Sequence, residues 1–248
     1  MSRLRRHQSV MKASIIIPAY NEIAVIEENM RKLDAWCAAN LSEYQIVIVS
    51  DGSTDGTREA VKKLACDHIK DAGYEKNRGK GGALKAGVSA SDGDILITTD
   101  CDLAYGFEII GQAVNFFEKE PDTELLIGSR NASDNGFDGY PPLRKLASKT
   151  YFHLLKMLSG IKESDSQCGF KCYKSNVGKH LFSLLDTEGF AFDLEILMRA
   201  EHEGRVIREL PVRIINHGNS KISVMRDSLG MLKDAMRIRK ELGSKCNP

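Results

Sequence analysis

Acidic residues stand directly after two short apolar runs of this sequence. The run 46–50 (IVIVS) leads into Asp51, and the run 95–99 (ILITT) leads into Asp100, Cys101 and Asp102. β-Branched runs followed by Asp and Gly predict buried parallel strands, and open α/β sheets bind ligands at the carboxyl ends of their strands. A carboxylate there can hold a ribose or a base edge, and a D-x-D pair can hold a divalent cation against phosphates. These positions predict a site for a nucleotide diphosphate and a metal ion.

A glycine-rich segment, 77–82 (NRGKGG), has the composition of a phosphate-binding loop but fits neither standard pattern. Gly81 stands where a Walker A motif needs Ser or Thr, and Leu84 stands where GxGxxG needs its last glycine. The segment predicts a glycine-rich loop entering a helix over 79–90. Its backbone N–H groups and the cations Arg78 and Lys80 could bind an anion there. A tight loop with solvated charges is the alternative.

The elements that would position these residues alternate between strand and helix. Strands are expected at 14–17 (closed by Pro18), 45–50, 68–71, 94–99, 124–129 and 205–215. Helices are expected at 22–39, from Thr57 with Asp55 as cap, and at 107–118, 143–158, 175–184, 191–203 and 224–242. Residues 131–142, rich in Asn, Asp, Gly and Pro, predict a long loop of the kind that forms lids. The alternation predicts an α/β fold with a mostly parallel sheet and helices on both faces.

Composition narrows the class of protein. Across 248 residues, 35 Lys and Arg balance 34 Asp and Glu, so no overall field favours nucleic acid. No apolar stretch approaches the ~18–20 residues that span a bilayer. The basic residues 1–12 lack the apolar core of a signal peptide. The six cysteines show no zinc or disulfide spacing, which favours free thiols in a reducing cytosol. We expect a cytoplasmic protein, with peripheral contact at the cytoplasmic membrane face as an option.

Eight short motifs, taken in order, resemble the family 2 inverting glycosyltransferases of the GT-A fold, a Rossmann-like, mostly parallel sheet flanked by helices. They are IIIPAYNE (15–22), SDGSTDGT (50–57), NRGKGGA (77–83), DCD (100–102), GSR (128–130), DSQCGFK (165–171), FAFDLE (190–195) and GNSKIS (218–223). The set is similar to the dolichyl-phosphate glucosyltransferases and mannosyltransferases. The resemblance covers residues 13–223, and it depends on the whole series rather than on any single motif.

The resemblance implies a role for each candidate residue. The nucleotide-sugar donor would be bound by Pro18, Ala19, Tyr20, Glu22, Asp51, Lys80, Asp100, Cys101 and Asp102. The metal, Mg²⁺ or Mn²⁺, would bind Asp100 and Asp102, which with Arg130 and Arg144 are the expected catalytic residues. The acceptor phosphate would be held by Arg130, Arg144 and Ser148. Further candidates are Gln167, Lys171, Asp193, Glu195 and Lys221. Capping of the next turn is the alternative role for the two metal-site aspartates.

The acceptor decides the mechanism. A phosphate monoester, with a second pKa of about 6, is largely ionised near neutral pH and can attack without a strong base. A sugar hydroxyl would need a base, for which Asp165, Asp193 and Glu195 are available. The predicted function is hexose transfer, with inversion, from a nucleotide sugar to polyprenyl or dolichyl phosphate. UDP-glucose is favoured over GDP-mannose because 77–83 and 167–171 resemble the glucosyl branch. The alternatives are a family 2 enzyme acting on a sugar hydroxyl in cell-wall or surface polysaccharide synthesis, and a non-catalytic nucleotide-sugar binding protein.

The expected organisation is a flexible basic segment (1–12), a GT-A domain (13–223) and a C-terminal amphipathic helix (224–248). Within that helix, apolar and basic side chains alternate. The apolar ones are Val224, Leu229, Leu232, Met236 and Ile238, and the basic ones are Arg226, Lys233, Arg237, Arg239 and Lys240. Such a helix suits an anionic membrane surface, and equally it could pack its apolar stripe on the domain.

Overall fold

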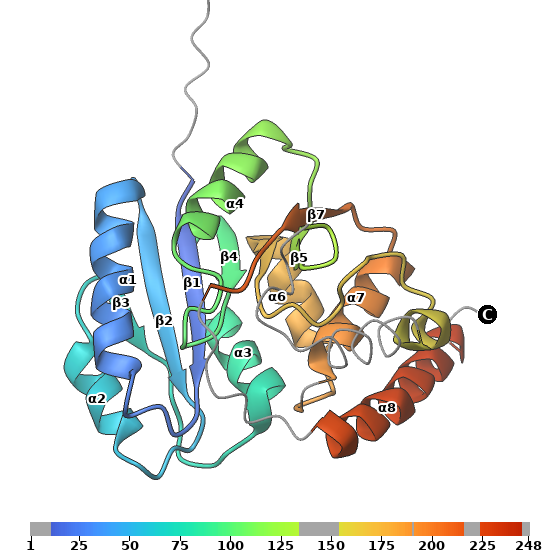
Figure 1. Cartoon of the computed structure of the whole chain (residues 1–248), viewed down its shortest axis with the longest axis horizontal. Helices are drawn as coiled ribbons and strands as arrows, with labels where there is room; N and C mark the ends of the chain where they lie inside the picture. Colours follow the sequence, from blue (N-terminus) through green and yellow to red (C-terminus); the bar gives the residue numbers. More distant parts are fainter. Residues whose placement is uncertain (1–10, 134–153, 190, 216–223, 245–248) are drawn as a thin grey trace, which may run out of the picture.

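The computed structural model describes residues 11–133, 154–189, 191–215 and 224–244. Its centre is a seven-stranded sheet in the order β3-β2-β1-β4-β6-β5-β7 (Figure 1). The strands are β1 (Ala13–Ala19), β2 (Tyr44–Ser50), β3 (Ile69–Asp71), β4 (Ile95–Thr98), β5 (Leu125–Ser129), β6 (Lys171–Lys174) and β7 (Ile207–Pro211). All neighbouring pairs are parallel except β4–β6 and β5–β6. The predicted α/β fold with a mostly parallel sheet is therefore confirmed.

Helices cover both faces of the sheet. They are α1 (Ile26–Asn40), α2 (Thr57–Leu64), α3 (Gly79–Ala90), α4 (Glu108–Lys119), α6 (Ser175–Ser183), α7 (Phe192–His202) and α8 (Val224–Ser244), with a further helical turn at 154–159. Side chains alternate across the sheet, as expected for strands. Ile15 and Ile17 of β1 join a core with α1, α2 and α4, whereas Ile16 joins a second core with α3, α6, α7 and α8.

The sequence suggested that Pro18 closes the first strand, but the structure shows that it does not. β1 continues to Ala19, and Pro18 lies beside Val49 of β2. Ala19 O accepts a hydrogen bond from Asp51 N on the β2 side, whereas Ile16 O accepts one from Thr99 N on the β4 side. Pro18, two residues after Ile16, faces the β4 side, where β4 has already ended. A missing N–H costs nothing at such a position.

Strand β6 was not predicted. It lies antiparallel between β4 and β5, and its residues Lys171, Cys172 and Tyr173 are fully buried. The alternation of strands and helices gave no reason to expect a strand that returns without a helical crossover. The strand-favouring residue Tyr173 was the available signal.

Two helix starts also differ from the prediction. Residues 79–82 form the first turn of α3, not a loop before it. In α2 the N-cap is Gly56, one residue after the predicted Asp55. Asp55 still contributes, because its carboxylate accepts hydrogen bonds from Thr57 N (3.0 Å) and Ile23 N (3.1 Å).

The C-terminal helix α8 packs on the rest of the protein beside α7 (Figure 1). Its buried residues are Met231, Ala235, Ile238 and Leu242, which recur at helical spacing. Met236, expected in the apolar stripe, lies off it and is 53% exposed. Within the described residues, no helix has the length and apolar character to cross a membrane.

Candidate active site

The carboxyl ends of β1, β2 and β4 lie at one edge of the sheet, because these strands are parallel neighbours. Asp51 follows β2 there and is almost fully buried. Its Oδ1 accepts a hydrogen bond from Arg78 N (2.7 Å), and its carbonyl accepts one from Asn77 Nδ2 (3.0 Å). The Arg78 guanidinium lies 4.6 Å from the centre of the Tyr74 ring. Burial and the nearby Asp51 carboxylate raise the pKa of Tyr74. These contacts fix the segment 50–52, which carries Asp51, against the segment 74–78.

The loops that follow β1 and β2 are bound to each other. Asn21 N donates to Ser53 Oγ (3.1 Å), Thr54 N donates to Asn21 Oδ1 (2.9 Å), and Glu22 N donates to Thr57 Oγ1 (2.8 Å). Asn21 has a φ of 54°, a left-handed conformation that Asn tolerates. These contacts hold the segment 18–22, which carries four of the predicted donor-binding residues, next to Asp51.

The D-x-D pair follows β4. Lys80 Nζ lies 2.5 Å from Asp100 Oδ1. A Cβ added at Gly169 would overlap Asp100 Oδ2, so this carboxylate keeps its present position only while residue 169 is glycine. Burial, followed by the negative charge of Asp100, raises the pKa of Asp102, and Glu22 adds to the shift. Glu22 therefore belongs to the same negative region.

The two aspartates fit a hard divalent ion. Their carboxylates repel each other, as the raised pKa of Asp102 indicates, and a cation would relieve that repulsion. Among the described residues, no group of three His, Cys, Asp or Glu side chains could hold a metal. Mg²⁺ commonly uses one or two carboxylates and completes its shell with water and substrate phosphates. Asp102 also caps its own turn, since Oδ1 accepts a hydrogen bond from Ala104 N (3.1 Å).

The glycine-rich start of α3 is occupied by protein contacts. Gly79 N donates to Asn77 Oδ1 (3.1 Å), and Gly81 N donates to Glu188 O (2.8 Å). These two N–H groups already have acceptors within the protein, so they are not available to bind an anion. Of the anion-binding groups expected at this helix start, Lys80 places its side chain at Asp100. Burial alone would lower the pKa of Lys80, but Asp100 and Asp193 outweigh it and raise the pKa.

Arg130 follows β5 and forms a bidentate pair with Asp165. Its Nε donates to Oδ2 (2.7 Å), its Nη2 donates to Oδ1 (2.8 Å), and its backbone N–H donates to Oδ2 (3.1 Å). Gln167 N also donates to Asp165 Oδ1 (3.2 Å). Sequence reasoning had named Asp165 only as an available base. The structure makes it the partner that orients Arg130.

Three further candidates are buried in ion pairs. Lys171 Nζ lies 2.8 Å from Asp193 Oδ1 and donates to Cys168 O (2.5 Å). Burial raises the pKa of Asp193, although Lys171 and Lys80 oppose the shift. Glu195 is fully buried and accepts hydrogen bonds from the Arg199 guanidinium at 2.6 and 2.8 Å.

The other candidates are placed less centrally or lie outside the described residues. Gln167 Nε2 contacts Met231 Sδ of α8 at 3.0 Å. Cys101 is buried, and its carbonyl accepts a hydrogen bond from Asn29 Nδ2 (2.9 Å). Tyr20 is 45% exposed. The residues outside the described part of the chain are Arg144, Ser148 and Lys221. Sequence reasoning missed the contributions of Tyr74 and Gly169; the signal for Gly169 was its place within the DSQCGFK motif.

Comparison with known proteins supplies the family. The model of Glycosyl transferase family 2 matches residues 14–182. The chain belongs to glycosyl transferase family 2. It is therefore a glycosyltransferase.

Similar curated proteins cover most of this glycosyltransferase. A dolichyl-phosphate beta-glucosyltransferase of Saccharomyces cerevisiae is 32% identical over 91% of the chain and 73% of its own length. The enzyme of the same name from Dictyostelium discoideum is 31% identical over 91% of the chain and 73% of its own length. Glycosyltransferase AglD of Haloferax volcanii is 29% identical over 92% of the chain, which spans only 37% of that protein.

Solved structures show the same fold. Glucosyl-3-phosphoglycerate synthase from Mycobacterium tuberculosis, crystallised with Mn²⁺, UDP-glucose and phosphoglyceric acid, superposes with a TM-score of 0.68. It shares 18% identity over 94% of this chain and 79% of that one. This likeness supports the GT-A fold of the family 2 enzyme.

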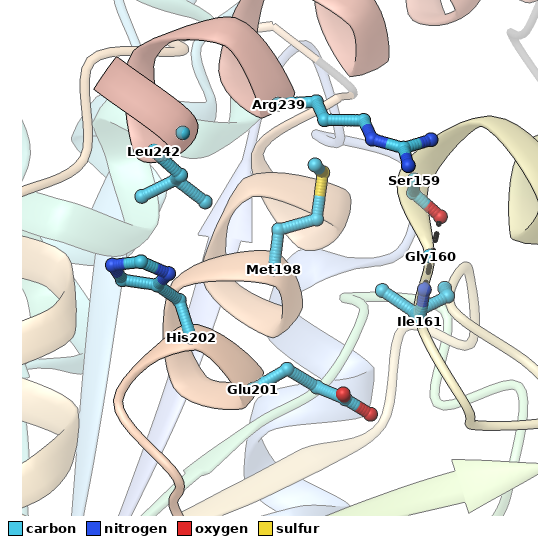
Figure 2. A pocket seen from close by; sticks show the side chains of 9 residues that line it. Ser159, Gly160, Ile161, Met198, Glu201, His202, Arg239 and Leu242 are labelled. Carbon is cyan, nitrogen blue, oxygen red and sulfur yellow. Dashed lines mark hydrogen bonds between the residues drawn. The ribbon is translucent and has the colours of Figure 1, made fainter. Parts of the chain in front are cut away.

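The glycosyltransferase also has a cavity of about 300 Å³ between the helical turn at 154–159 and the ends of α7 and α8 (Figure 2). Met198, Leu242 and Ile161 form its apolar wall, with His202 and Arg239 also lining it. None of the candidate residues lines this cavity. We therefore place the candidate active site at the carboxyl ends of β2 and β4, which Asp51, Asp100 and Asp102 follow.

Proposed function

We propose that this glycosyltransferase transfers glucose from UDP-glucose to a polyprenyl phosphate such as dolichyl phosphate, with inversion and with Mg²⁺ or Mn²⁺ as cofactor. GDP-mannose is the second candidate donor. The observation that carries the proposal is the placement of Asp51, Asp100 and Asp102 at one sheet edge, with Lys80 on Asp100. The names of the dolichyl-phosphate beta-glucosyltransferases to which the chain is similar support the choice of donor and acceptor.

On the donor side, ionised Asp51 would accept a hydrogen bond from the base. A metal ion held by Asp100 and Asp102 would supply positive charge for the leaving diphosphate. Lys80 adds a fixed cation beside the same carboxylates. Glu22 and Tyr20, in the segment tied to the β2 loop, would line the ribose side of the pocket. Together these residues would bind and orient the nucleotide.

On the acceptor side, the state of the buried carboxylates favours a phosphate nucleophile. Asp193 is paired with Lys171 and Glu195 with Arg199, so both are already committed to cations. A sugar hydroxyl would need a base at the site, whereas a phosphate is already ionised near neutral pH. Asp165 takes two of the five N–H donors of Arg130 and fixes the direction of its guanidinium. Arg130, with Arg144 and Ser148, would then bind the acceptor phosphate.

A lipid acceptor also implies peripheral contact with a membrane. In α8, Met236 is 53% exposed, and Lys233 and Lys240 stand about one helical turn before and after it. Such a combination suits an anionic lipid surface. Sedimentation with vesicles containing anionic lipid should carry the wild-type protein down, and Met236→Asp should reduce the bound fraction. Wild-type protein that stays in the supernatant at low salt would contradict the contact.

The donor and metal assignments are tested with a panel of nucleotide sugars and a short polyprenyl phosphate. We expect UDP-glucose to give the fastest transfer, loss of activity in excess chelator, and recovery with Mg²⁺ or Mn²⁺. Full activity in chelator would remove the metal from the proposal. Faster transfer from GDP-mannose would replace the donor while leaving the acceptor in place.

A further inference from the structure

We propose that Glu195 is a positioning residue of the donor site. It fixes the loop 186–189, the backbone of that loop holds the first turn of α3, and the first turn of α3 places Lys80 against Asp100. The inference rests on the proposed function in one respect, the assignment of Lys80 and Asp100 to the donor site. It assigns a role in that site to a residue that touches neither carboxylate of the D-x-D pair.

The Glu195 side chain binds backbone N–H groups of the loop 186–189. The side chain is fully buried on α7, and it accepts hydrogen bonds from Asp186 N (3.2 Å) and Thr187 N (2.9 Å). The Arg199 guanidinium, one turn further along α7, balances its charge at 2.6 Å. Burial alone would raise the pKa of Glu195, but these hydrogen bonds lower it, so the group is ionised at neutral pH. An ionised carboxylate is the stronger acceptor for the two loop amides.

The loop in turn holds the start of α3. Glu188 O accepts a hydrogen bond from Gly81 N (2.8 Å). A Cβ added at Gly79 would lie 2.6 Å from Glu188 O, and one added at Gly81 would lie 2.5 Å from Thr187 O. No side chain fits at either position, so the helix backbone rests directly on the loop backbone. Gly79 also has a φ of 79°, which favours glycine.

Lys80 lies between these two glycines. Its backbone is therefore held against the loop on both sides, and its Nζ lies 2.5 Å from Asp100 Oδ1. A displacement of the loop would move Lys80 relative to Asp100. A second contact limits such displacement from the outer side, because Arg237 of α8 donates to Thr187 Oγ1 (2.8 Å). The path from Glu195 to the donor site therefore consists of short contacts, from the buried bond at Thr187 N to the partly exposed pair of Lys80 and Asp100.

Glu195→Gln tests the proposal, with Glu124→Gln as a matched control. Glu124 also accepts from a guanidinium, Arg205 Nη1 (3.0 Å), and from a backbone amide, Val206 N (2.9 Å). It precedes β5, so it lies at the opposite edge of the sheet from the donor site. Both changes remove the charge of a carboxylate that accepts from a guanidinium and from backbone N–H groups. Glu195 is fully buried and the Glu124 side chain is 23% exposed, so the Tm of each variant is measured alongside. A general loss of stability would affect both variants, whereas a positioning role affects only the first.

The readouts are the Kd of UDP with Mg²⁺, measured by calorimetry well below the melting temperature of each variant, and hydrogen exchange at the Gly81 amide. We expect Glu195→Gln to weaken UDP binding about tenfold, or ~1.4 kcal/mol, and to speed exchange at Gly81. Glu124→Gln should change neither. In steady-state assays, Glu195→Gln should raise the donor KM more than it lowers kcat.

A second variant changes the contact between the loop and α3 on the helix. Gly81→Ala introduces the Cβ that overlaps the loop, and we expect it to weaken UDP binding as Glu195→Gln does. Gly81→Ala also tests the proposal if Glu195→Gln does not fold. UDP affinity equal to wild type in the folded variants, or equal losses in Glu195→Gln and Glu124→Gln, would overturn the positioning role. Wild-type protein that binds no UDP would instead overturn the proposed function. Exchange at Gly81 then still decides the positioning role, which fails if exchange is unchanged in Glu195→Gln.

Discussion

Replacing Asp165 by Asn should strongly destabilise the protein. Both oxygens of this fully buried carboxylate accept hydrogen bonds from Arg130, at 2.7 and 2.8 Å. Asn would remove the charge and turn one acceptor into a donor that faces the guanidinium. The Arg130 side chain is only 12% exposed, so its buried charge would lose the Asp165 carboxylate. Breaking one partner of a buried pair costs ~3–5 kcal/mol, which for a chain of this size lowers Tm by roughly 6–20 °C.

Thermal unfolding across a pH series measures this effect and its sign. Burial alone would raise the pKa of Asp165, but Arg130 outweighs burial and lowers it. The contribution of the carboxylate to the free energy of unfolding is therefore complete above the pKa of the unfolded state, about 3.9. It is lost as pH falls through the lower pKa of the folded state. The gap between wild type and Asp165→Asn should be widest at neutral pH and should shrink below about pH 4.

A surface pair supplies the control. Lys12 and Asp92 lie 2.7 Å apart, but Asp92 is well exposed, so Asp92→Asn should change Tm little. An Asp165→Asn variant as stable as wild type at neutral pH would refute the reasoning. So would a gap that persists undiminished in acid.

Three further predictions concern the donor site. Asp100→Asn should abolish Mn²⁺ binding measured by electron paramagnetic resonance. It should lower Tm much less than Asp165→Asn does, because the Lys80–Asp100 pair is partly exposed. Tight Mn²⁺ binding by the variant would exclude Asp100 as a ligand. Asp51→Asn should weaken UDP binding by ~1.5–3 kcal/mol, the value of a charged hydrogen bond, and unchanged affinity in calorimetry would make Asp51 structural. Gly169→Ala should lower turnover by displacing Asp100 Oδ2. Turnover by this variant equal to that of wild type would show that catalysis does not require the present position of the Asp100 carboxylate.

Local pattern was sufficient to predict the parallel strands and the acidic residues that follow them. β2 and β4 are short apolar runs, and Asp51 and Asp100 were placed at their ends because carboxyl ends of parallel strands share an edge. The prediction that β1 ends before Pro18 was wrong because it did not consider the neighbouring strand. Pro18 breaks a strand only where its N–H is needed, and the length of β4 decides that.

Contacts between distant segments could not be predicted in the same way. Asp165 lies 35 residues from Arg130, and Glu188 lies far along the chain from Gly81, so no spacing indicated that each pair would meet. β6 was missed for the same reason, since its partners β4 and β5 come from an earlier part of the chain. The pair of Glu195 with Arg199 is different, because it is an (i, i+4) contact within α7. What local spacing could not show is the contact of Glu195 with the loop amides of Asp186 and Thr187.

The central claim is that a lipid phosphate, not a hydroxyl, accepts the sugar. The most direct measurement offers UDP-glucose with either a short polyprenyl phosphate or the polyprenol of the same chain length, and identifies products by mass. The account predicts a product one hexose heavier from the phosphate and none from the alcohol. Transfer to the polyprenol, with none to the phosphate, would contradict it.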